Sequence, residues 1–166
     1  IKKIKKKFDV VILNGVLEHL IDLTKSINFL HSIIKKNGYI FIHVPNDFNI
    51  CQRYYLRKYK IKDDRAPWVT YEHNHYFNKD SLNKIMIKKF KKVLIMGDFP
   101  IDLFLLNQKT NYYENKSFGK YAHDIRQKFN LLFRGNKFKM GTYIEFCIAL
   151  CNLGLGRSLI GCFKKK

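Results

Sequence analysis

The sequence has few acidic residues and few arginines, and both shortages bear on what the protein binds. Asp and Glu together number 13 of 166 residues, against 32 Lys and Arg, so the formal net charge is +19. The basic residues are mostly lysine, whereas arginine is the residue that best reads phosphates and base edges. We therefore do not expect nucleic-acid binding as the main role, although the charge favours an anionic small-molecule substrate.

The sequence also lacks paired cysteines and a long uninterrupted apolar segment. Its four cysteines form no CxxC pair, and no histidine near Cys147 and Cys151 completes a set of metal ligands. Buried free thiols in a reducing, cytoplasmic environment are the expected state, and the first residues do not resemble a signal peptide. Residues 144–163 approach membrane-spanning length, but Glu145, Arg157 and three glycines interrupt them. No stable membrane insertion is expected.

Apolar runs alternate with amphipathic stretches, and this order predicts an α/β fold. The apolar fraction of 46% fits a globular domain with a core. Residues 8–13 form a continuous apolar run, typical of a strand buried on both faces, and residues 39–44 form a second run. Between them the spacing predicts a helix from Asp22 to a stop at Asn37-Gly38. This strand–helix–strand unit makes two parallel strands with a right-handed crossover.

The rest of the chain continues the alternation after a long connection. Residues 47–70 are polar and aromatic, with one helical piece expected at 51–58, and a loop of this length is often a lid over a site. The remaining elements expected are a helix starting at 78–81, a strand at 92–96, one or two helices within 99–133, a last helix at about 142–153 and a strand at 157–163.

Polar residues follow both of the first two strands, at Asn14 to His19 and at His43 to Asp47. In open α/β sheets, ligands bind beyond the carboxyl ends of the strands. A pocket is therefore expected where these two strand ends meet.

Several ordered motifs resemble class I S-adenosylmethionine-dependent methyltransferases. Residues 8–20, FDVVILNGVLEHL, resemble the fourth strand of that family and the turn after it. Residues 30–46 resemble its leucine-rich helix and fifth strand, with Asn37-Gly38 in place of Gly-Gly. Residues 71–82, with YEHNHYF and Ser-Leu, resemble one branch of the family, the methyltransferase domain 23-like branch, as do residues 99–104 and 153–157. The resemblance covers nearly the whole chain in the right order.

This resemblance implies a partial Rossmann-like methyltransferase sheet, strands four to seven, with flanking helices. Residues 1–166 would then be the C-terminal part of a single methyltransferase domain. Within it, residues 47–78 would form a substrate loop or lid, and residues 99–141 a helical insertion before the last helix and strand.

One departure from the family pattern concerns the cofactor. The family holds it mainly through a Gly-rich turn after the first strand, where the absence of side chains lets the backbone approach the ligand. Nothing before Phe8 supplies that turn, and a Lys-rich run from Ile1 leads straight into the first strand. We therefore expect the missing N-terminal part of the same domain to be a partner of this chain. The isolated chain is expected to expose a central strand edge, to be marginally stable and to be inactive.

The resemblance also implies where ligands lie. Cofactor contacts fall on Asn14, Gly15 and Val16, although an ordinary strand-to-helix turn would explain them as well. Glu18 and His19 would orient the substrate or cap the next helix. Two further substrate-binding candidates are Tyr76 and Arg157, of which Arg157 would contact a phosphate, cap the last helix or start the strand.

The candidate catalytic residues are His73, His75 and Glu72. A histidine can remove a proton from a hydroxyl as the methyl group arrives, and Glu72 could orient its ring. The structural alternative is stacking of the two rings beside Tyr71 and Tyr76. No third ligand stands out near His73 and His75, so no metal is expected.

The function implied is methyl transfer from S-adenosylmethionine to a small metabolite, a sugar or a lipid-like acceptor. Two alternatives remain open from the sequence. One is a basic α/β module that binds nucleic acid or another anionic partner, with an affinity that falls steeply with salt. The other is a truncated relic without function.

Overall fold

The protein is built on a mixed sheet of four strands. The computed structural model describes residues 4, 6–133 and 137–166, so part of the basic N-terminal run, residues 1–3 and 5, lies outside the described residues. The strands are β1 (Phe8–Asn14), β2 (Ile34–Pro45), β3 (Phe90–Gly97) and β4 (Ser158–Lys165), in the order β1-β2-β4-β3. β1 and β2 are parallel, whereas β4 is antiparallel to β2 and β3. The predicted α/β class with a partial Rossmann-like sheet is confirmed.

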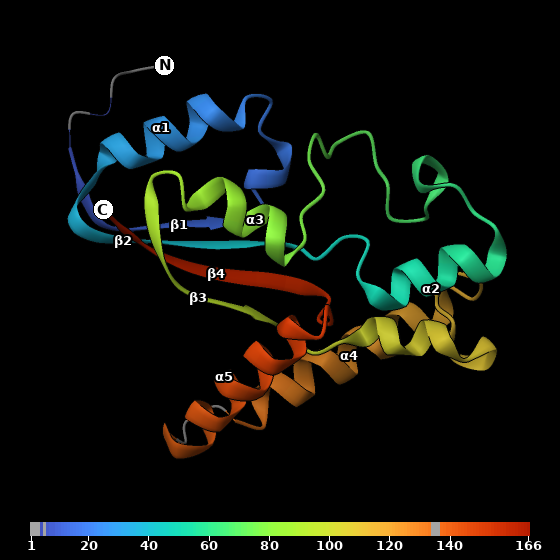
Figure 1. Ribbon diagram of the computed structural model, residues 1–166. Coiled ribbons are helices and arrows are strands. Elements are labelled where there is room, and N and C mark those ends of the chain that lie inside the picture. Colours follow the sequence, from blue (N-terminus) through green and yellow to red (C-terminus); the bar gives the residue numbers. More distant parts are fainter. Residues whose placement is uncertain (1–3, 5, 134–136) are drawn as a thin grey trace.

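Helices cover the sheet unevenly. In Figure 1, α1 and α3 lie above the sheet, while α4 and α5 lie below it and α2 lies to one side. None of the helices in the described ranges is long and apolar enough to cross a membrane. The helices are α1 (Leu23–Ile33), α2 (Ile50–Tyr59), α3 (Lys79–Met86), α4 (Ser117–Leu131) and α5 (Lys137–Asn152), with short 3-10 helices η1 (Leu17–His19), η2 (Asp63–Arg65), η3 (Ile101–Leu106) and η4 (Gln108–Thr110).

The core lies between the sheet and the pair α1 and α3. Alternate residues of β2 point into it, so Ile40, Ile42 and Val44 are fully buried, as the two-residue period of a strand requires. The intervening Tyr39 and Phe41 stay partly exposed. α1 and α3 supply the opposing apolar side chains, which are Ile27, Leu30, Ile33, Leu82 and Met86.

β1 is a strand, as predicted, but it is not buried on both faces. Val10 is 47% exposed and Ile12 is 70% exposed. Within the described residues β1 pairs with β2 alone, so one edge of the strand and one of its faces are uncovered.

The predicted end of the first helix is wrong. α1 ends at Ile33 and β2 begins at Ile34, so Asn37-Gly38 lies inside the strand. Asn37 has a positive φ of 64°, and a side chain at Gly38 would meet the carbonyl oxygen of Asp9 at 2.8 Å. Because β1 passes this close and the β1–β2 register shifts here, Asn37-Gly38 forms an irregularity within the strand and does not end a helix.

The segment 47–78 contains the predicted helical piece as α2, whose N-cap Asn49 accepts hydrogen bonds from the amides of Cys51 and Gln52. α2 packs on η3 and forms a second apolar cluster away from the sheet. The buried members of this cluster are Tyr55, Leu56, Ala66, Trp68 and Leu105. The last helix, α5, begins at Lys137 rather than near Thr142.

Candidate functional site

The carboxyl ends of β1 and β2 lie side by side, as predicted. Asn14 pairs in register with His43, and the amide of Gly15 donates a hydrogen bond to the carbonyl of His43 at 3.0 Å. Gly15 has φ 63°, a left-handed conformation that glycine adopts without a steric penalty, and the chain turns there into η1. The turn places Glu18 and His19 directly beyond the sheet.

The segment before α3 is tied to η1 by hydrogen bonds. The amides of Asn74 and His75 both donate to the carbonyl oxygen of Glu18, at 2.9 and 3.1 Å. The side-chain amide of Asn74 donates to the carbonyl of His19 at 2.7 Å. Farther along, the amide of Asp47, just after β2, donates to the carbonyl of Phe77 at 2.8 Å. Two segments far apart in the sequence are thereby held against each other beyond the ends of β1 and β2.

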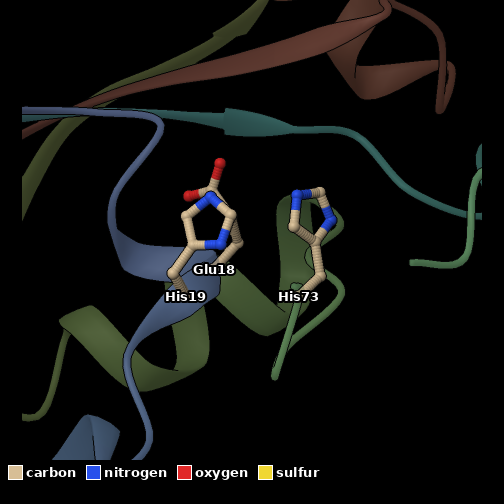
Figure 2. Close-up of side chains that lie close together, drawn as sticks. All are labelled: Glu18, His19 and His73. Carbon is tan, nitrogen blue, oxygen red and sulfur yellow. The ribbon is translucent and has the colours of Figure 1, made fainter. Parts of the chain in front are cut away.

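Glu18, His19 and His73 come together in this arrangement (Figure 2). One potential ligand atom from each of the three lies within 4.8 Å of the others, and the rings of His19 and His73 meet edge to face with centroids 4.8 Å apart. Glu18 is only 3% exposed. Glu18 Oε2 and His73 Nδ1 are buried and have no hydrogen-bond partner in the structure.

The tautomer of His19 follows from its contact. His19 Nδ1 lies 2.8 Å from the carbonyl oxygen of Glu72, and a carbonyl can only accept. Nδ1 therefore carries the proton in the neutral ring, and Nε2 keeps its lone pair. Glu72, whose side chain was expected to orient a catalytic ring, is exposed and contributes its main-chain carbonyl to His19.

The other predicted residues of this segment lie outside the cluster. The His75 ring packs near Phe77, with centroids 6.2 Å apart, and its buried Nε2 has no partner. The hydroxyl of Tyr76 donates to the carbonyl of Thr70 at 3.0 Å and accepts from its amide at 3.1 Å. These two hydrogen bonds hold the hydroxyl of Tyr76 to the loop. The Tyr76 ring lies tilted beside the His73 ring, with the ring centroids 5.9 Å apart.

Buried charges gather next to the cluster, around Arg157. Burial raises the pKa of Asp47 to about 7, Asp102 and Glu18 act in the same direction, and Arg157 opposes them. Burial acts to lower the pKa of Arg157, but nearby acids, Asp102 first among them, outweigh it and raise that pKa above its ordinary value. Asp47 Oδ2 and Arg157 Nη1 are buried without hydrogen-bond partners.

Sequence reasoning missed both acids of this group. Asp47 stands at one of the two strand ends that the sequence singles out, so its place was available as a signal. Asp102 lies in η3 and is 1% exposed, within residues 99–104, a stretch that resembles the family but gives this acid no role. It accepts hydrogen bonds from the side chains of Asn49, Gln52 and Tyr112, which come from two separate segments.

The turn at the end of β1 is open to solvent. Asn14, Gly15 and Val16 are all exposed there, where a ligand can reach them. Val16 also borders an apolar groove of about 440 Å³. The side chains of Leu13, Leu20, Phe29 and Leu30 form most of its lining, with Lys25 and Ser26 at its polar part.

Comparison with known proteins bears on the identity of this fold. The sequence model of a family described as the methyltransferase domain matches residues 1–90 of the 166. No curated protein matches the chain.

Solved structures of methyltransferases are similar to this chain. One is a provisionally assigned sarcosine dimethylglycine methyltransferase from Galdieria sulphuraria, with 14% identity, a TM-score of 0.48, and coverage of 97% of this chain and 54% of that one. A second is a SAM-dependent methyltransferase from Archaeoglobus fulgidus, with 20% identity and a TM-score of 0.46. The match covers 96% of this chain and 60% of that one. A third is phosphoethanolamine N-methyltransferase 2 from Haemonchus contortus, with 11% identity, a TM-score of 0.42, and coverage of 95% and 33%. The chain thus spans 33–60% of the lengths of these three chains.

Proposed function

This chain belongs to the methyltransferase domain family, and we propose that it carries the acceptor-binding side of an S-adenosylmethionine-dependent methyltransferase. The observation that carries the proposal is the cluster of Glu18, His19 and His73 at the carboxyl ends of two adjacent parallel strands, beside the exposed turn at Gly15. This is the edge at which open α/β sheets bind their ligands.

The cofactor contacts that this chain supplies are Asn14, Gly15 and Val16. S-adenosylmethionine, when bound, supplies an electrophilic methyl group. The exposed turn and the adjoining groove hold one side of the cofactor, and the positive φ of Gly15 keeps that turn open to it.

The acceptor is a small molecule with hydroxyl or amine donors. Glu18 Oε2 and ring nitrogens of His73 and His75 are buried without partners, and such atoms are costly to leave unpaired. A substrate whose O–H or N–H groups reach them would satisfy these acceptors. The unpaired Nη1 of Arg157, close to Asp47, can donate to an anionic part of the same molecule, so a small metabolite, a sugar or a lipid-like headgroup fits.

His73 accepts the proton that the acceptor loses on methylation. It lies at the strand ends, partly buried, with a nitrogen that no protein group occupies. His19 and Glu18 border it, and the Tyr76 ring limits its movement from the other side. A positioned base of this kind typically contributes 10²–10⁴-fold to the rate.

Further strands of the same domain complete the sheet at the free edge of β1. The exposed Val10 and Ile12 would be covered by such a neighbour. We therefore expect the 166-residue chain alone to transfer no methyl group, and the product of a longer reading frame that contains it to be active.

The test uses that longer product and replaces His73 with alanine. The expected result is a kcat lower by on the order of 10²-fold or more, with unchanged affinity for S-adenosylhomocysteine. His123→Ala, at an exposed position on α4, is the control and should keep the wild-type rate. An unchanged kcat in the His73 variant would remove His73 from the mechanism.

A further inference from the structure

We infer that Glu18, His19 and His73 form a binding site for one divalent transition-metal ion, of which zinc is the representative. Two imidazoles and one carboxylate are a common ligand set for zinc sites that keep a fourth position open. Magnesium and calcium prefer oxygen ligands alone, so this mixed set favours a metal that accepts nitrogen. The inference concerns metal binding and does not depend on methyl transfer.

The geometry is close to that of a bound site. The three ligand atoms lie within 4.8 Å of one another. At bond lengths of about 2.0–2.2 Å, ligands of a tetrahedral zinc ion stand about 3.4 Å apart, so a pair of ligand atoms 4.8 Å apart has to close by about 1.4 Å. All three side chains have rotatable bonds through which their ligand atoms can approach one another.

The candidate ligand residues are held by hydrogen bonds of the kind that orient ligands in metal sites. His19 donates Nδ1–H to the carbonyl of Glu72, which holds the ring and directs the lone pair of Nε2 outward. The carbonyl of Glu18 accepts from the amides of Asn74 and His75, so the turn that carries Glu18 is fixed to the segment that carries His73. The ligands come from two segments that are already joined before any metal binds.

The unpaired atoms point to a ligand that the protein itself does not supply. Glu18 is 3% exposed, yet its Oε2 has no hydrogen-bond partner. A buried carboxylate without a partner is costly, and it is normally paired with a cation or coordinated to a metal. A metal ion between Glu18 and the two imidazoles would remove this cost.

A metal at this position changes the role of His73. A coordinated imidazole does not accept a proton, so the base role proposed for His73 belongs to the metal-free protein, and a bound metal would block it. Whether the cluster binds a metal is therefore tested by measuring metal affinity, without measuring the rate of methyl transfer.

The experiment titrates the metal-free 166-residue chain, purified without a histidine tag, with Zn²⁺ against a chromophoric chelator. One zinc per chain is expected. Glu18→Gln and His73→Ala should each weaken binding by at least about 100-fold, because losing even a group that hydrogen-bonds a metal ligand costs about 10–100-fold. His75→Ala, two positions from His73 and outside the cluster, is the matched control and should bind as the wild type does.

A second measurement needs no variant. Co²⁺ added to the wild-type chain should give the visible absorption of a four- or five-coordinate site with nitrogen ligands, and one equivalent of Zn²⁺ should abolish it. Substoichiometric zinc, a Co²⁺ spectrum identical to that of the ion in buffer, or equal weakening by His75→Ala would overturn the inference. Failure of zinc binding would leave the His73→Ala kinetic test of methyl transfer unaffected.

Discussion

Asp47→Asn should remove a pH dependence of stability that the wild-type protein shows between about pH 4 and pH 7. Asp47 is 3% exposed, and its Oδ2 has no hydrogen-bond partner. Burial, reinforced by Asp102 and Glu18 and opposed by Arg157, raises its pKa to about 7 from the model-compound value of 3.8. Asparagine has nearly the same shape and carries no charge at any pH.

The direction of this pH dependence of stability follows from proton binding. Between the two pKa values, folded Asp47 binds a proton that unfolded Asp47 has already lost. The contribution of this carboxyl to stability is therefore complete below about pH 4 and is lost as the pH rises through about 7. A shift of about three units corresponds to at most about 4 kcal/mol, at 1.36 kcal/mol per unit.

The assay is urea unfolding followed by circular dichroism at pH 4, 5, 6, 7 and 8. The difference in unfolding free energy between the variant and the wild type should grow with pH, to several kcal/mol in favour of the variant by pH 8. Asp64→Asn, at an exposed carboxylate of η2, is the control. A difference that stays constant with pH, or that favours the wild type at high pH, would refute the reasoning.

Three more substitutions test the fold. Asn78→Ala breaks the capping box of α3 and should lower the unfolding free energy by about 1 kcal/mol in denaturant titrations; no change would exclude the cap. Gly156 has φ 101°, and the Cβ of Gly156→Ala would lie 2.8 Å from the Cα of Gly97. Gly156→Ala should therefore lower the unfolding free energy by well above the roughly 1 kcal/mol expected for Gly154→Ala, whose Cβ enters open space at φ 73°. Equal losses in the two variants would contradict this packing. Ile12→Thr at the uncovered edge of β1 should reduce self-association in sedimentation velocity runs while stability changes by about 0.5 kcal/mol or less, and undiminished association would argue against that edge.

The order of the strands and helices could be predicted because periodicity and capping signals are local. The strand formed by the apolar run at residues 8–13 and the N-cap of α3 at Asn78 appear where the sequence predicts them. The end of α1 could not be predicted, because Asn-Gly is typical both of a helix stop and of a left-handed residue inside a strand. Only the close passage of Asp9 beside Gly38 decides between them.

The sequence marks the three residues of the cluster but not their grouping. Glu18, His19 and His73 were each singled out, yet the sequence considered His73 together with His75, its neighbour along the chain. The partners of His73 come instead from η1, because the hydrogen bonds of Asn74 and His75 to Glu18 join two distant segments. The grouping of Asp47, Asp102 and Arg157 likewise depends on tertiary contacts that leave no local pattern.

Isothermal titration calorimetry of S-adenosylhomocysteine against the product of the complete reading frame is the decisive measurement for the methyltransferase assignment. One site per chain is expected, with affinity lost in Gly15→Val, because a β-branched residue is strained at φ 63° and fills the turn, and kept in His73→Ala. No binding, or equal affinity in the wild type and the Gly15 variant, would contradict a cofactor site at the end of β1.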